Sequence, residues 1–102
     1  MVVNGEFLEG IIMAVINENR AGAYGYEIAS IVAPALNISE STVYSICNRL
    51  MRRGYLETAK DVIVVDGRIR KFYFVTDAGN QKLIRLKKQY SKEKKALDQW
   101  LL

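Results

Sequence analysis

The feature that most constrains this chain is the spacing of apolar residues between Ser39 and Arg53. They recur at the intervals of one buried face of an α-helix. Ser39 precedes this face as a capping residue, Ile38 forms a hydrophobic staple with the fourth helical residue, and Gly54 follows as a terminator. The segment is therefore predicted to be a helix whose buried face consists of Val43, Ile46, Cys47, Leu50 and Met51.

The opposite side of the same helix carries short hydroxyls, an amide and two guanidinium groups. Such groups hydrogen-bond to base edges and phosphates, and none is bulky enough to keep a helix out of a groove. We interpret the segment as a DNA recognition helix. Its outward residues are predicted to be Ser41, Ser45, Asn48, Arg49 and Arg52.

Size and composition predict one globular unit. The chain has 102 residues, of which half are hydrophobic and a quarter charged. Its longest apolar stretch, Phe7–Ile16, is interrupted by Glu9 and is too short to span a bilayer. No leader-like pattern precedes this stretch, so a cytoplasmic protein without membrane contact is expected.

The residue types argue against an enzyme or a metal site. The chain has no histidine and one cysteine, which excludes a zinc site and a histidine-based catalytic group. Neither a phosphate-binding glycine loop nor a nucleophile–base pair is visible. No cofactor is therefore expected, and Cys47, on the buried face, is expected to be an unreactive thiol.

The net charge of +4 is unevenly distributed. Residues 1–48 hold one basic and five acidic residues, whereas residues 49–76 hold seven basic and three acidic ones. Residues 77–102 again hold seven basic and three acidic residues. This distribution suits a polyanionic partner such as double-stranded DNA, and charge alone is equally compatible with a solvated basic surface.

Two helices precede the recognition helix. A broad apolar stripe predicts the first over residues 6–17, with Asn4 as its cap, and a shorter one is predicted from Tyr24 to Val32. The second should bury Ile28, Ile31 and Val32 and stop at Pro34. The order of helix, turn and capped polar-faced helix is that of a helix-turn-helix unit.

A β-hairpin is predicted after the recognition helix. Tyr55–Val65 and Arg70–Thr76 are rich in β-branched and aromatic residues and flank the tight-turn pair Asp66-Gly67. Such a hairpin is a wing, and its basic tip could touch phosphates or reach the minor groove. The alternative is a hairpin that covers the core and carries solvated charges. The basic residues at or near the tip are Arg68, Arg70 and Lys71.

The chain closes with a long helix predicted over Asp77–Leu101 and capped by Thr76. Its apolar residues follow heptad spacing with one charged interruption at Glu93, which favours pairing with a second copy over folding back on its own core. The expected fold is thus mainly α with a small β-hairpin (α+β), with a winged helix-turn-helix domain at residues 1–76 and a dimerisation helix at 77–102. The predicted dimer contacts are Leu83, Leu86, Tyr90, Leu97 and Trp100.

Several short motifs, in this order and spacing, resemble those of the PadR-like winged-helix transcriptional regulators, in a short form with one C-terminal dimerisation helix. The chain departs from the family pattern at Val43, Ser45 and Phe72. The motifs are Tyr24-Gly25-Tyr26-Glu27-Ile28, Ser41-Thr42-Val43-Tyr44, Asn48-Arg49-Leu50, Gly54-Tyr55-Leu56, Gly67-Arg68-Ile69-Arg70-Lys71-Phe72-Tyr73 and Thr76-Asp77-Ala78-Gly79.

This resemblance implies a homodimeric repressor on a roughly palindromic operator. It implies a DNA contact from Tyr44, whose alternative role is to pack under its helix. It also implies contacts of Tyr24 and Tyr26 with the DNA backbone, and for each of these the alternative is a packed tyrosine. Some relatives release DNA when a flat, apolar (aromatic) effector binds between the subunits. The resemblance assigns the analogous position here to Tyr90 and Trp100. The alternative role of both residues is to form part of the dimer core. A protein-interaction module without DNA binding is the alternative function. The predicted DNA contacts are Ser39, Ser41, Thr42, Tyr44, Ser45, Asn48, Arg49, Arg52, Arg68, Arg70 and Lys71.

Overall fold

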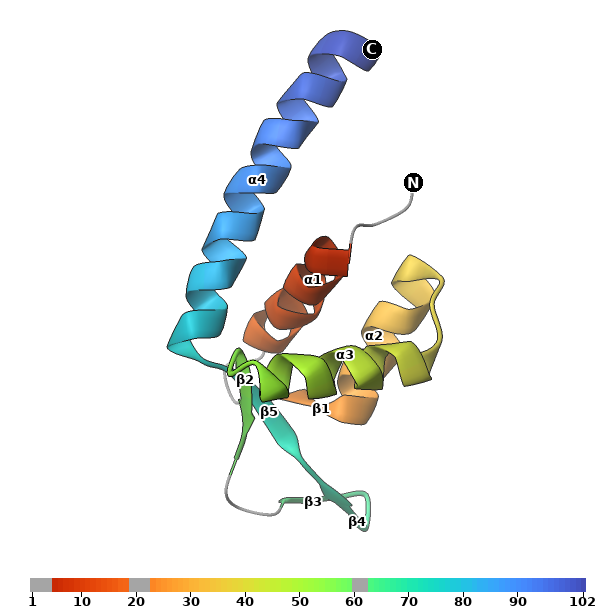
Figure 1. Cartoon of the computed structure of the whole chain (residues 1–102). Helices are drawn as coiled ribbons and strands as arrows, with labels where there is room; N and C mark the ends of the chain where they lie inside the picture. Colours follow the sequence, from red (N-terminus) through yellow and green to blue (C-terminus); the bar gives the residue numbers. More distant parts are fainter. Residues whose placement is uncertain (1–4, 19–22, 60–62) are drawn as a thin grey trace.

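The computed structural model describes residues 5–18, 23–59 and 63–102, and it confirms a mainly α fold with a small antiparallel β component (Figure 1). A body of three helices carries the strands below it, and a long final helix rises beside it. The helices are α1 (Gly5–Glu18), α2 (Gly25–Leu36), α3 (Glu40–Arg52) and α4 (Asp77–Leu101); the strands are β1 (Ala23–Tyr24), β2 (Leu56–Thr58), β3 (Ile63–Val65), β4 (Arg68–Arg70) and β5 (Phe72–Val75).

Helix α1 begins and ends within one residue of its predicted bounds. Its proposed cap, Asn4, lies outside the described residues. The stripe of α1 packs against α2, α3 and α4, so this helix lies at the centre of the body. The fully buried side chains of the core come mostly from the three helices of the body: Ile12, Met13, Ile16, Ile28, Val32, Val43, Cys47 and Leu50.

Helix α2 differs from its prediction in length and in its buried face. Pro34 lies inside the helix and does not stop it. Proline lacks an N–H and crowds the carbonyl four residues before it, and here the helix continues for only two residues beyond it, so little of the hydrogen-bond pattern is affected. The helix instead ends at Asn37, whose left-handed backbone (φ 53°) places the Ile38 N–H 3.0 Å from the Ala33 carbonyl oxygen. Ile31 was predicted to be buried but is 49% exposed.

Helix α3 has the predicted capping at both ends. The Ser39 hydroxyl accepts a hydrogen bond of 3.1 Å from the Thr42 N–H. At the other end Gly54 adopts a positive φ of 80°, and Gly54 and Tyr55 donate their N–H groups to the carbonyls of Met51 and Leu50. The helix is therefore held at both termini by bonds that its own sequence supplies.

The strands form two small sheets. In the first, β5 lies between β1 and β2, with Tyr73 opposite both Ala23 and Thr58. In the second, β3 and β4 form the predicted hairpin, and Asp66 and Gly67 both adopt the positive φ of a type I′ turn. The first predicted strand corresponds to β2 and β3, and the second to β5 and the end of β4. The strand β1 was not predicted, because a strand of two residues is too short to show an alternating pattern.

Helix α4 matches its predicted bounds and its predicted cap. The Thr76 hydroxyl accepts from the Gly79 N–H at 3.1 Å and donates to the Gly54 carbonyl at 2.7 Å. Its first three turns pack on α1, and every residue from 87 to 102 is exposed. The molecule is therefore 52 Å long and only 28 by 22 Å across (Figure 1).

Candidate nucleic-acid interface

The side of α3 that faces away from the core is open to solvent. It lies opposite the buried apolar residues, because the 3.6-residue period of the helix places the apolar and the polar residues on opposite sides. The Ser39 hydroxyl contacts those of Ser41 (3.1 Å) and Thr42 (2.8 Å), so the first turn presents a linked group of three hydroxyls. The exposed residues of this face, all predicted as DNA contacts, are Ser39, Ser41, Thr42, Ser45, Asn48 and Arg52.

Tyr44 lies at the edge of this face and is half-buried. Its ring packs against Gly25 so closely that a Cβ atom there would lie 2.8 Å from Tyr44 Cε1. Burial, with a smaller contribution from the charge of Glu40, raises the pKa of its hydroxyl. The ring therefore packs under the helix, and its hydroxyl stays a hydrogen-bond donor at neutral pH.

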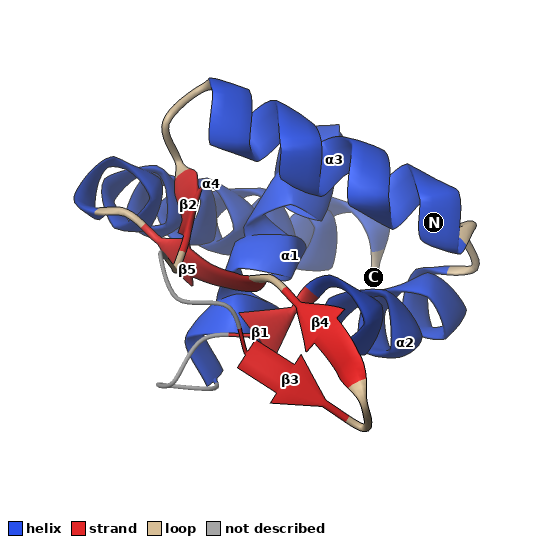
Figure 2. Cartoon of the chain, turned by 90° about the horizontal axis from the view of Figure 1, so that it is seen from below, coloured by secondary structure: helices blue, strands red, loops and turns tan. Residues whose placement is uncertain are grey.

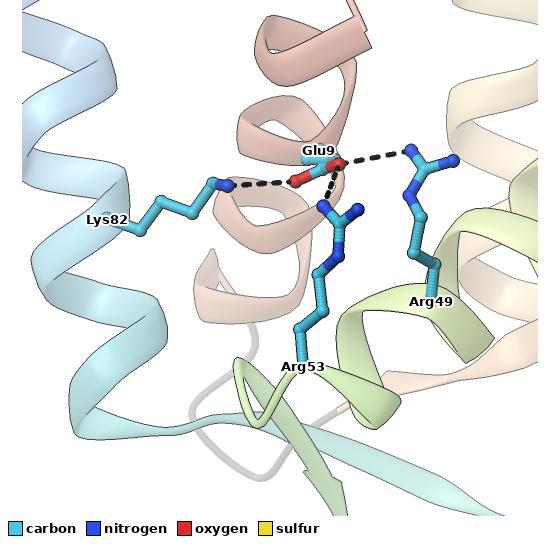
Figure 3. Close-up of polar contacts among 4 residues, drawn as sticks. All are labelled: Glu9, Arg49, Arg53 and Lys82. Carbon is cyan, nitrogen blue, oxygen red and sulfur yellow. Dashed lines mark hydrogen bonds and ion pairs between the residues drawn. The ribbon is translucent and has the colours of Figure 1, made fainter.

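Arg49 does not lie where the helix wheel placed it. Its Nη2 donates to Glu9 Oε1 of α1 at 3.1 Å, so the guanidinium turns back toward the body (Figure 3). Arg53 also reaches this oxygen, at 3.6 Å. A carboxylate on the neighbouring helix decides this orientation, and a wheel for α3 alone does not contain that information.

The hairpin β3–β4 lies beside β1 and α2 (Figure 2). Arg70 contacts both elements, because its guanidinium carbon lies 5.3 Å from the ring centre of Tyr24 and 5.5 Å from that of Tyr26. Arg70 is half-buried, whereas Arg68 and Lys71 are exposed. The two exposed cations are free to meet phosphates, and Arg70 is engaged with aromatic rings of the same chain.

The predicted dimer contacts separate into two groups. Leu83 and Leu86 are buried in the core of their own subunit, with Leu86 Cδ1 close to the backbone of Gly10. Their burial within one subunit leaves them little surface for the predicted dimer contact. Tyr90, Leu97 and Trp100 are exposed. The ring of Tyr90 meets that of Phe7 edge-on, with the two ring centres 6.1 Å apart.

An apolar groove of about 870 Å³ runs between α1 and α4. Its walls include Phe7, Ile11, Leu86, Tyr90 and Leu97. Trp100 lies beyond it, in a smaller depression of about 410 Å³ that shares Leu97 with the groove. The two residues predicted for an effector therefore border separate depressions within one subunit.

Sequence reasoning missed the cluster around Glu9. The signal was present, because Glu9 shares the stripe of Ile12, Met13 and Ile16, and Lys82 shares that of Gly79, Leu83 and Leu86. A charged residue on a buried stripe requires a partner. The sequence around Glu9 does not show that Lys82 is its partner, and the sequence around Lys82 does not show Glu9, because the two residues lie on helices far apart in the chain.

Other kinds of site find no support in the described part of the chain. The ranges 5–18, 23–59 and 63–102 contain no group of three metal-ligating residues. No helix in those ranges combines the length and the apolar character required to cross a membrane. Cys47 is buried, and burial raises the pKa of its thiol to about 11.

Comparison with known proteins places this arrangement in a family. The Transcriptional regulator PadR-like family matches residues 12–85. A protein of unknown function from Lysinibacillus sphaericus is 34% identical over 95 residues, which are 89% of this chain and 84% of that protein. The crystal structure of a Streptococcus mutans UA159 protein is 34% identical, with a TM-score of 0.84 over 96% of this chain and 89% of that one.

A structure described as a PadR-like transcriptional regulator, from Bacillus cereus ATCC 14579, is 25% identical. Its TM-score is 0.78 over 92% of this chain and 90% of that one. The family match covers the second half of α1, then α2, α3 and the strands, and the start of α4. The chain therefore belongs to the PadR-like family of transcriptional regulators, which are not enzymes.

Proposed function

We propose that this regulator binds double-stranded DNA with the exposed face of α3 in the major groove and the wing against the backbone. The observation that carries this proposal is the division of α3 into an apolar face, buried except for the half-buried Met51, and an open face of small polar groups. Asn48 and the hydroxyls of the first turn have the donors and acceptors to read base edges. Arg52, Arg68 and Lys71 are suited to phosphates.

We further propose that the protein acts as a homodimer on a palindromic operator, most simply as a repressor. Residues 87–102 are exposed along their whole length and still carry Tyr90, Leu97 and Trp100. An amphipathic helix that extends beyond its own domain is stabilised when a second copy covers its apolar side. Residues 1–76 would then supply the DNA contacts and the part of 77–102 beyond Leu86 the dimer contacts.

The groove between α1 and α4 supports a site for a flat apolar effector. Its size suits a small molecule, and its lining is aromatic and aliphatic with a few charged residues at the rim. In a dimer the second subunit would cover part of this groove. Binding there would alter the packing of α4 and thereby release DNA.

The test is a fluorescence-anisotropy titration with DNA taken from upstream of the chain's own coding sequence. Binding should weaken steeply with salt, because each neutralised phosphate releases counterions. Replacing Asn48 or Ser41 should change the preference among sequences. Absence of salt-dependent binding to any DNA would contradict the proposal and favour a protein-interaction module.

A further inference from the structure

Glu9 is a buried carboxylate surrounded by cations from two other helices. It is 3% exposed, and its Oε1 lies 3.1 Å from Arg49 Nη2 and 3.6 Å from Arg53 Nη1. Its Oε2 lies 3.2 Å from Nζ of Lys82 on α4, itself 7% exposed. One side chain therefore joins α1 to the C-terminal end of α3 and to the first turns of α4 (Figure 3).

Stability alone gives little reason for a buried charge cluster at this position. Apolar residues of similar volume often hold such a position as well as a buried ion pair does, or better. Within the described chain, Glu9 Oε2 receives no directed hydrogen bond and the buried Nε of Arg49 has no partner. Charged hydrogen bonds, such as that from Arg49 to Glu9, depend on the orientation of the two groups more than apolar contacts do. They can therefore favour one relative orientation of the helices.

The end of α3 is tied to α4 by further contacts around the same point. The Thr76 hydroxyl donates to the Gly54 carbonyl at 2.7 Å, and the Thr76 N–H donates to the Tyr55 carbonyl at 3.0 Å. The Nζ of Lys82 lies 4.7 Å from the ring centre of Tyr55. These contacts join the end of α3 to the base of α4 at one point, and the ion pairs of Glu9 add a second link between the two helices through α1.

We propose that Glu9 is a positioning residue for DNA recognition. It keeps Arg49 away from the phosphates and sets the angle between α3 and α4. Because α4 is the proposed dimer helix, that angle determines how far apart the two recognition helices lie. The inference rests on the proposed function, since it requires a dimer that reads two half-sites.

The first test measures how affinity depends on half-site spacing, with the spacer changed in single base-pair steps. Wild-type protein should lose about a hundred-fold in affinity when the spacing prevents both subunits from engaging. Glu9→Gln should reduce that loss to about ten-fold, because its recognition helices can adjust. Glu18→Gln, an exposed charge removal on the same helix, should behave like wild type.

Glu9→Gln leaves Lys82 buried without its partner, so its stability is expected to fall. The double variant Glu9→Gln/Lys82→Met removes both charges and should regain most of that stability, as measured by denaturant unfolding. Its spacing dependence should nevertheless stay shallow. A double variant with the wild-type spacing profile would overturn the inference, whereas a wild type indifferent to spacing would also contradict the proposed dimer.

The second test compares two arginines of the same helix. Arg52→Ala should reduce the slope of log affinity against log salt by about 0.9, the loss of one phosphate contact. Arg49→Ala should leave that slope unchanged, because Glu9 already holds its guanidinium. An equal reduction for both variants would show that Arg49 reaches DNA and would overturn the inference.

Discussion

Gly25 shows how one residue without a side chain shapes the interface. It begins α2 under the ring of Tyr44, where any Cβ would overlap that ring. The contact fixes Tyr44 at the edge of the recognition helix and brings α2 and α3 close together. The φ of Gly25 is not positive, so its backbone conformation does not require glycine. Glycine is required because the Tyr44 ring leaves no space for a Cβ atom.

Gly25→Ala should lower the free energy of unfolding by about 1–3 kcal/mol, because the Tyr44 ring must move from its packed position. Alanine favours a helix more than glycine does, and the overlap outweighs that gain. Gly5→Ala is the matched control, since no atom lies within 4 Å of its new Cβ. Chemical denaturation measures both variants, and equal stability of the two would refute the packing argument.

Cys47 has an acid–base consequence for stability. Burial raises its folded-state pKa from 9.0 to about 11, so the unfolded chain releases this proton at a lower pH. The stabilising contribution is complete below the unfolded-state pKa and is lost as pH rises through the folded-state value. The same direction holds for Tyr44 and Tyr73, whose pKa values are also raised by burial.

We therefore expect the free energy of unfolding to fall by roughly 2 kcal/mol more in wild type than in Cys47→Ala between about pH 8 and about pH 11. Denaturant titrations at the two pH values measure the difference. The thiol should also resist alkylation at neutral pH in the folded protein. Rapid labelling of native protein would contradict the buried position of this side chain.

At the scale of elements, the wing has a part fixed to the body and a part free for a ligand. Arg70 stacks on Tyr24 and Tyr26, while Arg68 and Lys71 extend into solvent. Basic residues adjacent in sequence therefore differ in role. Strand alternation places Arg68 and Arg70 on the same face of β4, so the contact of Arg70 with the two tyrosine rings distinguishes them.

Replacing both Arg68 and Lys71 with alanine should weaken binding to all DNA sequences and reduce the salt slope by about 1.8, two phosphate contacts. Arg70→Ala should instead release the hairpin from α2. Arg70→Lys should not rescue it, since lysine lacks the planar group that stacks. Anisotropy at several salt concentrations distinguishes the variants, and a fall of about 0.9 in the slope for Arg70→Ala would mean that Arg70 also contacts phosphate.

At the scale of the whole molecule, α4 is one continuous helix with a buried part and an exposed part. Its first three turns complete the core of the subunit, and its last four turns are exposed. Leu86 is a buried residue of the first part, and Trp100 is an exposed residue of the second part. A mutation in either half should therefore affect a different equilibrium.

Leu86→Ala should lower the free energy of unfolding of the subunit by about 2–5 kcal/mol, because it leaves a cavity against α1. Trp100→Ala should leave the subunit folded and raise the dimer dissociation constant. Sedimentation at several concentrations, together with thermal unfolding, separates the two effects. A Trp100→Ala protein with unchanged self-association would place the dimer contacts elsewhere.

The local signals of this chain determined its helices α3 and α4, their caps, the turn at Asp66-Gly67 and the buried face of α3 apart from Met51, which is half-buried. Each depends on residues within a few positions of one another, where period and capping chemistry act directly. Tertiary structure alone decided that Arg49 turns to Glu9, that Arg70 stacks on two tyrosines and that Leu83 and Leu86 belong to their own subunit. In each case the deciding partner lies dozens of residues away, and only the folded chain brings it within contact distance.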